Sequence, residues 1–440
     1  MEHWSFRRGF AVAQPFSSWV NGYCRVVRTA SKSALFAGLI ATMALPVAGG
    51  EDTTEQQILT RSRLTGDWNG TRSTLAQKGI SLEFEYTSTY QGLATGANAG
   101  KFGYGGKVDL YLNLDTQKLF RWPGGQLVGH FEFRNGAARA TLGGAVLPVN
   151  TAQVVPLGTP SQIVATSLYL RQSLSEKVSL LIGKINVLDL LANDPFFGGG
   201  GNRRFMNVAF VAPPSGVLPP VIFGAIANVQ TAPISWTAMV YDPNDRTGEY
   251  LPGDLFSDGV NVSLSGTYSG LVAGRGTKFT LGAIYSTKEG GDLSEVGLPP
   301  DLRTTKIKGS YNVSFQLSHF LQEDPAGGGG WGVFLKVGLS DGNPNTFKGF
   351  VTGGIGGKAL MFGRPQDNFG IGVFNYAFSD ELKSALDPTL NFDDERGIEI
   401  FYSRAITPWF HLTGDIQYID PATGDAGKGL ILGLRSNIRF

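Results

Sequence analysis

The feature that most constrains this chain is an alternation of apolar and polar residues that begins at Ile80 and recurs to the last residue. A period of two is typical of β-strands with one apolar and one polar face. Clusters rich in Gly, Pro, Asn and Asp separate the runs and favour turns. The alternation is clearest at 82–86, 108–114, 131–134, 168–171 and 313–317, and the turn clusters lie at 122–125, 242–245, 341–345 and 420–425. The sequence therefore predicts a long antiparallel meander.

A soluble β-sandwich would show the same alternation, so that fold remains an alternative. Three features favour a transmembrane barrel. No linker divides the meander into separate cores, and a barrel grows by adding strands while leaving no open edge. The chain also ends on a strand whose apolar face carries Phe440. Finally, aromatic residues crowd the expected strand ends, where membrane girdles place them: Tyr86, Tyr90, Phe401, Tyr402, Trp409 and Phe410.

The length of the meander predicts the size of the barrel. At about 20 to 25 residues per strand and connection, residues 80–440 accommodate roughly 16 strands, with 14 or 18 within error. Before it, residues 64–78 predict one short helix with Asp67 or Asn69 as the N-cap and Gly79 as the stop. The predicted fold is all-β, a transmembrane antiparallel β-barrel of about 16 strands with a short N-terminal helix.

Composition excludes other classes. The 37 basic and 36 acidic residues give a net charge of +1, so no global field recruits nucleic acid. A helical membrane protein needs apolar runs of about 20 residues. Beyond the N-terminal region the most apolar stretch, 216–229, is shorter and is broken by Pro219 and Pro220.

The N-terminus predicts export. A basic stretch precedes an apolar run at 34–48 that ends in small residues, the pattern of a secretory signal peptide. We expect a signal peptide at 1–49, a linker with the short helix at 50–79 and the barrel at 80–440. An uncleaved anchor and a twin-arginine signal at Arg7-Arg8 are the alternatives. Cys24 lies within the signal, so the mature chain would contain no disulfide, thiolate metal site or cysteine nucleophile.

Several short motifs carry a resemblance to a known family. They are found at 64–72 (LTGDWNGTR), 104–110 (YGGKVDL), 119–125 (LFRWPGG) and 407–409 (TPW), the last followed by Gln417-Tyr418. In this order they resemble the carbohydrate-selective porin (OprB) family over nearly all of 64–440. The stretches 145–157 and 217–229 match nothing in that pattern. The resemblance implies a barrel of about sixteen strands that passes sugars, with the N-terminal segment near the periplasmic opening.

A pore selects by its width and by the groups that line it. Sugar hydroxyls both donate and accept hydrogen bonds, so carboxylates, amides, guanidinium groups and aromatic faces suit a sugar channel. The alternation predicts seven inward side chains as candidate lining residues: Asp109, Glu132, Arg134, Tyr169, Arg171, Lys184 and Asn186. The alternative is that paired charges on neighbouring strands only brace the barrel wall.

A glycine-rich segment offers a second way to narrow a pore. Glycines at 198–201 allow a sharp bend, and an inward fold would place Arg203 and Arg204 in the channel. An ordinary external loop is the alternative that we favour from sequence alone.

Enzyme motifs find little support. The sequence 338–342 (GLSDG) matches a nucleophile elbow around Ser340, but a turn follows it where a helix is required. The histidines His3, His130, His319 and His411 show no paired metal-ligand spacing. An acidic turn at 393–395 is a better description of that segment than a calcium site. We expect no cofactor and no metal.

Together these observations predict a passive, non-enzymatic porin in the outer membrane of a Gram-negative bacterium. The expected partners are small sugars, outer-membrane lipid and lipopolysaccharide, without nucleic acid, and the oligomeric state stays open. A general or other-substrate porin is the first alternative, and an outer-membrane barrel hydrolase is the second.

Overall fold

The computed structural model describes residues 53–97, 99–136, 143–157, 161–387 and 389–440. The predicted signal peptide at 1–49, with Cys24, lies outside these residues. Among the described residues, the helices are too short or too polar for any of them to cross a membrane.

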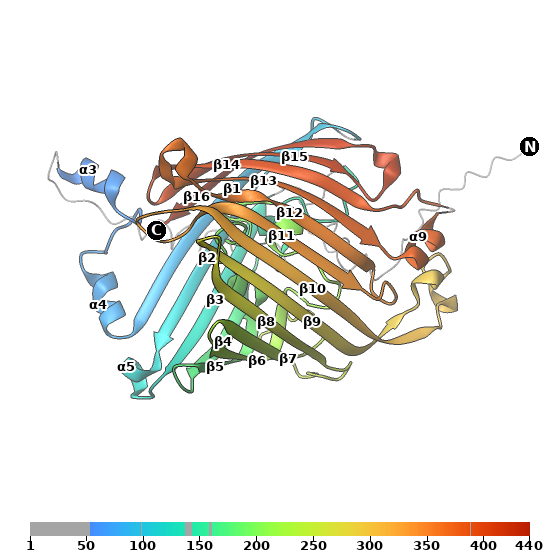
Figure 1. The fold of residues 1–440 in the computed structure, drawn as a ribbon, viewed down its shortest axis with the longest axis horizontal. Coiled ribbons are helices and arrows are strands. Elements are labelled where there is room, and N and C mark those ends of the chain that lie inside the picture. Colours follow the sequence, from blue (N-terminus) through green and yellow to red (C-terminus); the bar gives the residue numbers. More distant parts are fainter. Residues whose placement is uncertain (1–52, 98, 137–142, 158–160, 388) are drawn as a thin grey trace, which may run out of the picture.

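Sixteen antiparallel strands follow one another around a closed barrel, and β1 pairs with β16 to complete it (Figure 1). The predicted fold class is therefore confirmed. The strands are β1 (Ile80–Thr95), β2 (Phe102–Asp115), β3 (Gly125–Gly136), β4 (Ile163–Ser173), β5 (Val178–Asn186), β6 (Val221–Thr231), β7 (Ile234–Tyr241), β8 (Asn261–Val272), β9 (Arg275–Gly291), β10 (Lys306–Glu323), β11 (Gly330–Ser340), β12 (Phe347–Ala359), β13 (Arg364–Phe378), β14 (Glu395–Thr407), β15 (Phe410–Asp420) and β16 (Gly429–Arg439).

The two ends of the barrel carry connections of different length. Tight turns at 232–233, 273–274 and 408–409 lie at one end, whereas the connections at 187–220 and 242–260 lie at the other. In outer-membrane barrels the short turns face the periplasm and the long loops face outward. The short-turn end also holds helices α3 (Thr53–Thr60), α4 (Thr71–Gln77) and α5 (Thr116–Phe120) and the C-terminus (Figure 1). We call these ends periplasmic and extracellular. The extracellular end carries α9 (Asp380–Leu386).

The N-terminal segment differs from the expected single helix at 64–78. Helix α4 covers only Thr71–Gln77, and α3 (Thr53–Thr60) lies in the stretch expected to be a linker. The cause is a turn before α4, where Trp68, Asn69 and Gly70 adopt positive φ angles that an α-helix cannot contain. This segment packs next to the C-terminal end of the barrel, where Arg72 donates a hydrogen bond to the backbone oxygen of Phe440 at 2.9 Å.

Alternation sets the two faces of the wall. Residues paired across neighbouring strands share a face, so Leu264, Ala283 and Val313 form an outward row that continues along the strands to Leu281, which is 62% exposed. Such apolar rows suit the lipid. One expected girdle residue departs from this pattern: Phe401 faces the interior, with its ring centroid 4.9 Å from that of Phe205.

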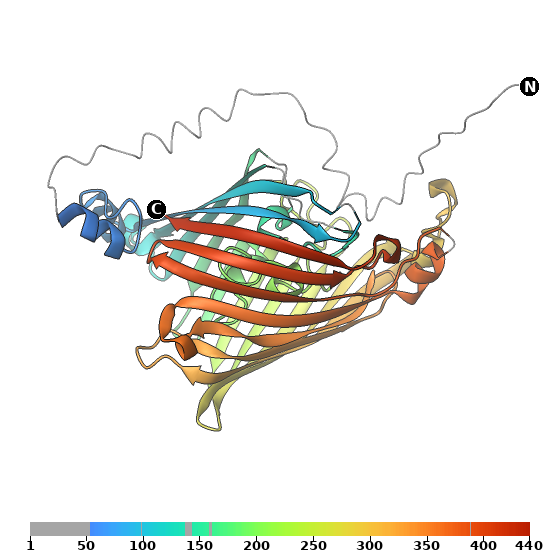
Figure 2. The same ribbon diagram turned by 90° about the horizontal axis from the view of Figure 1, so that it is seen from above.

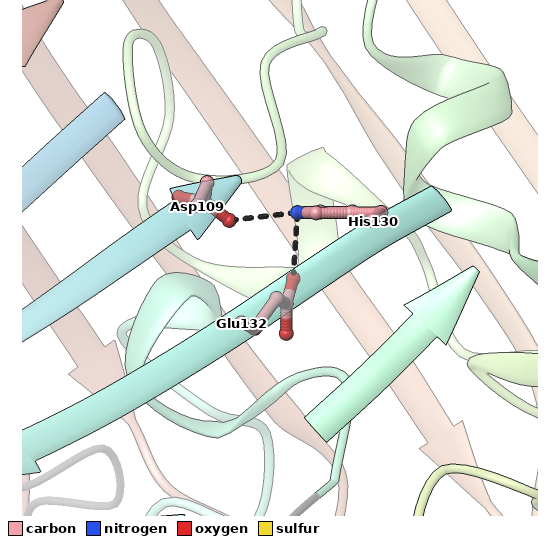
Figure 3. Close-up of side chains that lie close together, drawn as sticks. All are labelled: Asp109, His130 and Glu132. Atoms are coloured by element: carbon pink, nitrogen blue, oxygen red, sulfur yellow. Dashed lines mark hydrogen bonds and ion pairs between the residues drawn. The ribbon is translucent and has the colours of Figure 1, made fainter. Parts of the chain in front are cut away.

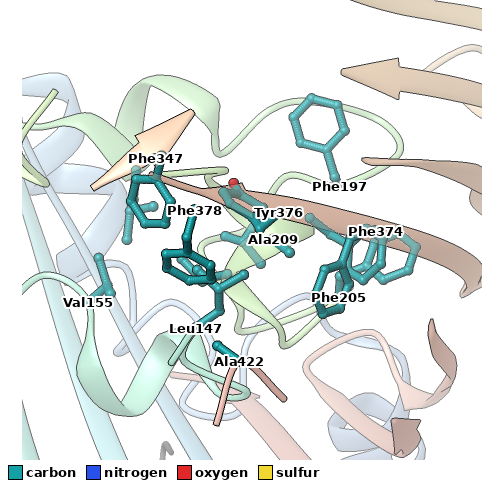
Figure 4. Packing of buried hydrophobic residues seen from close by; sticks show 14 of the residues in the cluster. Leu147, Val155, Phe197, Phe205, Ala209, Phe347, Phe374, Tyr376, Phe378 and Ala422 are labelled. Carbon is teal, nitrogen blue, oxygen red and sulfur yellow. The ribbon is translucent and has the colours of Figure 1, made fainter. Parts of the chain in front are cut away.

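Two extracellular connections fold back into the barrel. The inner loop, which we define as residues 187–220, contains α7 (Val187–Leu191) and α8 (Val208–Val211), and the β3–β4 loop contains α6 (Thr151–Val154). Figure 2 shows these segments between the strands of the wall. The largest buried apolar cluster lies here, where both loops pack against β11 to β14 (Figure 4). One side of the barrel interior is therefore filled.

Glycines on the wall make room for this packing. Gly370 and Gly372 lie on the inward face of β13, directly beneath Phe205 and Phe210 of the inner loop. A Cβ atom at Gly372 would lie 2.4 Å from a ring carbon of Phe210, so no side chain fits there without moving the loop.

A larger residue at Gly372 should therefore destabilise the barrel. We expect Gly372→Val to lower the free energy of unfolding by about 1–3 kcal/mol, the usual effect of overpacking. Urea denaturation of the protein refolded in lipid vesicles measures this change. Gly414→Val, at a position on β15 where a Cβ atom meets nothing within 4 Å, is the matched control. An equal decrease in the free energy of unfolding in the two variants would contradict the packing of Phe210 against Gly372.

Candidate functional site

Strands β2 and β3 bring an ionic cluster to the inner face of the wall. Asp109 lies opposite Glu132, and His130 Nε2 is 3.0 Å from Asp109 Oδ1 (Figure 3). The other ring nitrogen of His130, Nδ1, lies 3.0 Å from Asp189 Oδ1 on the inner loop. Lys107 Nζ lies 2.9 Å from both Asp109 Oδ1 and Glu132 Oε1. The four side chains on the wall are at most 3% exposed.

The cluster contains metal-ligand types but already holds a cation. One ligand atom each from Asp109, His130 and Glu132 lie within 4.8 Å of one another. The ammonium group of Lys107 forms ion pairs with both carboxylates, which is where a metal ion would bind. Because these charges already compensate one another, the arrangement braces the wall rather than forming an open metal centre.

Inner loops cover this side of the wall. Asn202 Nδ2 donates a hydrogen bond to Asp109 Oδ2 at 3.1 Å, and Arg203 forms an ion pair with Glu85 on β1. Arg134 donates to the backbone oxygen of Pro156 in the β3–β4 loop. Asp109, Glu132 and Arg134 thus point inward from the wall but are closed off by protein. In this position they orient the loops.

The glycine-rich segment at 198–204 lies inside the barrel, so the external loop that we favoured from sequence is wrong. Arg435 on β16, which is completely buried, donates hydrogen bonds to the backbone oxygens of Gly201 at 2.5 Å and Arg204 at 2.7 Å. Glu399 on β14 accepts hydrogen bonds from the backbone N–H groups of Met206 and Asn207. Charged side chains of the wall therefore hold the backbone of the inner loop.

Two of the predicted lining residues, Lys184 and Asn186, do not point into the lumen. Lys184 shares the face of Ile182, which is 52% exposed on the outer wall, and its Nζ donates to the backbone oxygens of Thr247 and Glu249 at 2.9 and 2.5 Å. It lies outside the wall, beneath the β7–β8 loop. Asn186, on the same face, caps α7 by accepting a hydrogen bond from Leu188 N.

The physical reason is that the interior is apolar at this point. The inward face of β5 carries Leu181 and Ile185, which pack with Ile222 and Tyr241 against Val187 and Leu218 of the inner loop. An interior filled by protein reverses the usual polarity of the two faces. Tyr169 packs against the same cluster, and Arg171 lies opposite Leu181 on the inward face.

The open space lies along β8 to β12, next to the packed cluster. A cavity of about 470 Å³ at the periplasmic end is lined by Arg204, Lys278, Ser318 and Phe320, among others. A second, of about 220 Å³, lies between the inner loop and the wall, and Thr280, Ser314, Gln316 and Lys336 contribute to it. Thr280 and Lys278 are two residues apart on β9, as are Gln316 and Ser318 on β10. The two cavities are therefore consecutive along the same strands.

Small polar side chains cover the wall of this passage. The inward face of β8, β9 and β10 is formed by cross-strand rows such as Ser265–Gly282–Ser314 and Thr267–Thr280–Gln316. Lys336 on β11 continues the second row, with its Nζ 2.8 Å from the backbone oxygen of Phe210 and 3.2 Å from the centroid of the Phe197 ring. Hydroxyl and amide groups therefore face the cavities.

Ser340 lies on β11 rather than at a strand-to-helix turn. Its Oγ accepts a hydrogen bond from the amide of Asn312 at 2.9 Å and lies 3.4 Å from the backbone oxygen of Ser215. The nucleophile-elbow geometry requires a following helix, whereas residues 341–346 connect β11 to β12.

Sequence reasoning missed most residues of the passage. The inward positions Ser314, Gln316 and Ser318 could be identified by alternation, but charged residues were preferred as candidates. Of the predicted residues, Arg204 lines a cavity. The signal that was present is the row of serines and threonines along β8 to β10.

Comparisons with known proteins agree with this architecture. A family model described as carbohydrate-selective porin, OprB family, matches residues 99–440. The high-pH structure of OprB from Pseudomonas putida is similar with a TM-score of 0.74 and 19% identity, over 87% of this chain and 99% of that one. The outer membrane channel DcaP of Acinetobacter baumannii gives a TM-score of 0.51 and 10% identity, over 82% and 97%. Curated proteins gave no significant sequence match.

At such identities the structural likeness shows a shared fold alone, and the family model carries the assignment. That model spans β2 to β16 and leaves out only β1, which pairs regularly with both neighbours and completes the barrel. The chain belongs to the OprB family of carbohydrate-selective porins.

Proposed function

We propose that the protein is a passive channel for small sugars in the outer membrane of a Gram-negative bacterium, without a catalytic step. Solutes pass between the inner loop and strands β8 to β11. The observation that carries this proposal is the hydroxyl- and amide-rich wall that faces the two consecutive cavities. Sugar hydroxyls leave their water shell when groups that both donate and accept replace it.

The inner loop supports selectivity over general diffusion. A sixteen-stranded barrel encloses a wide aqueous lumen unless protein fills it. Here the loop occupies one side, and its residues Leu191 and Pro195 line the passage. An apolar surface opposite a hydroxyl-rich wall matches the two kinds of surface that a sugar ring presents.

Liposome swelling tests this proposal. Vesicles that contain the purified protein should take up glucose faster than neutral solutes of similar size that lack a ring of hydroxyls. Ser314→Leu should slow the entry of glucose, because it replaces a hydroxyl in the passage with a bulky apolar group. Val313→Leu, on the adjacent outward position of the same strand, is the control. Equal entry of sugars and size-matched solutes would indicate a general porin.

A further inference from the structure

We infer that this channel prefers carbohydrates that carry one negatively charged group, such as a carboxylate or a phosphate, over neutral sugars of the same size. The inference rests on the proposed function and specifies its substrate class. The observation behind it is the charge of the groups along the passage: Arg204, Lys278, Lys336 and Lys358 contribute to the two cavities, and no carboxylate is among the described residues that line them.

Three of these four cations lack a carboxylate partner. Arg204 donates a hydrogen bond to the backbone oxygen of Asp194 at 2.7 Å, and Lys336 donates to that of Phe210. For Lys278, which is exposed on the inward face of β9, the described part of the chain supplies neither a hydrogen bond nor an ion pair. Only Lys358 is neutralised, by Asp324 at 2.7 Å.

Backbone N–H groups occupy an oxygen of each of two nearby carboxylates, Asp194 and Glu323. Asp194 Oδ1 accepts hydrogen bonds from the N–H groups of Phe196 at 2.8 Å and Phe197 at 3.1 Å. Glu323 Oε1 accepts one from the N–H of Gly276 at 2.9 Å. Among the described residues, Lys278 therefore presents an uncompensated positive charge on the inward face, while these two carboxylates are held by backbone groups.

The cations also follow one another along the path. Lys336 lies in the second cavity, and Lys278 and Arg204 lie in the periplasmic one. An anion that leaves the first site meets the next before it reaches the mouth. Rings or rows of Lys and Arg are the arrangement that anion-passing pores use. A narrow, low-dielectric passage strengthens this attraction relative to bulk water.

Swelling assays with three probes test the inference: glucose, gluconate and glucose 6-phosphate. Faster entry of either anionic probe than of glucose supports it, and the two arms distinguish carboxylate from phosphate. Glucose entering as fast as both anions would overturn this inference alone. Entry of none of the three would overturn the proposed function as well.

Variants locate the effect. Lys278→Gln should reduce the advantage of the anionic probes and shift the reversal potential in a KCl gradient away from chloride preference. Lys177→Gln removes a charge from the periplasmic β4–β5 turn, outside the lining of both cavities, and should change neither. A further measurement needs no variant. The preference of the wild-type channel for anionic probes should weaken as the salt concentration rises, because at about 0.1 M salt screens charges over about 10 Å. A preference independent of salt and of Lys278 would overturn the inference.

Discussion

Lys107→Met is expected to lower the free energy of unfolding by about 3–5 kcal/mol, the loss typical when one partner of a buried ion pair is removed. The substitution leaves the carboxylates of Asp109 and Glu132 buried at the inner face of the wall without their shared cation. His130 remains hydrogen-bonded to Asp109 and compensates only in part. Urea denaturation in lipid vesicles, followed by tryptophan fluorescence, measures the change.

The matched control is Lys308→Met on β10. Lys308 is 78% exposed and lies 3.7 Å from Glu289, so its loss should cost no more than about 1 kcal/mol. The double variant Lys107→Met, Glu132→Gln should regain part of the stability, because one of the two uncompensated charges is removed as well. If Lys107→Met lowered the free energy of unfolding no more than Lys308→Met does, the bracing role of the cluster would be contradicted.

Removal of the inner loop is expected to raise single-channel conductance severalfold and to abolish discrimination between sugars and size-matched solutes. Asn186 and Val221, which flank the loop, are paired across β5 and β6, so a short Gly-Ser turn can replace residues 187–220. Without the loop, a sixteen-stranded barrel leaves a wide aqueous channel. Planar-bilayer recordings measure the conductance.

A second loop provides the control. Tyr241 and Asn261 are paired across β7 and β8, so the β7–β8 loop can be shortened in the same way. That loop lies over the outside of the wall at Lys184, and its removal should leave the conductance unchanged. Because removal of the inner loop also exposes apolar residues, Arg435→Met offers a milder test: it deletes the hydrogen bonds to Gly201 and Arg204 and should raise conductance less.

The barrel was predictable from sequence because alternation is a local signal. The residues of each strand alone indicate which face is apolar, and the Gly- and Asp-rich turns indicate where each strand ends. The size of the barrel followed from length divided by the typical strand unit. The helix at 64–78 was predicted too long, because positive φ angles at Trp68 and Asn69 leave no clear mark in composition.

The site was less predictable because it depends on how loops fill the interior. Alternation correctly predicts that Asp109 faces inward and Val108 outward. It cannot predict that Asn202, on a loop distant in sequence, covers Asp109. Because the inner loop fills the interior at β5, the inward face of this strand is apolar and Lys184 faces outward. This is the reverse of the polarity expected for a water-filled barrel. A folded-in loop is a tertiary event, and its only sequence signal was the glycine run at 198–201.

The most direct test of the account is cysteine blocking at two inward positions. Cys24 is the only cysteine of the chain and precedes the barrel, so a barrel position changed to cysteine can be labelled selectively. Ser314→Cys lies in the passage, whereas Thr89→Cys lies in the filled side, completely buried on the inward face of β1. After a bulky thiol reagent is added, we predict that sugar entry falls sharply for Ser314→Cys and stays constant for Thr89→Cys. Block at Thr89→Cys with free passage at Ser314→Cys would contradict the path proposed here.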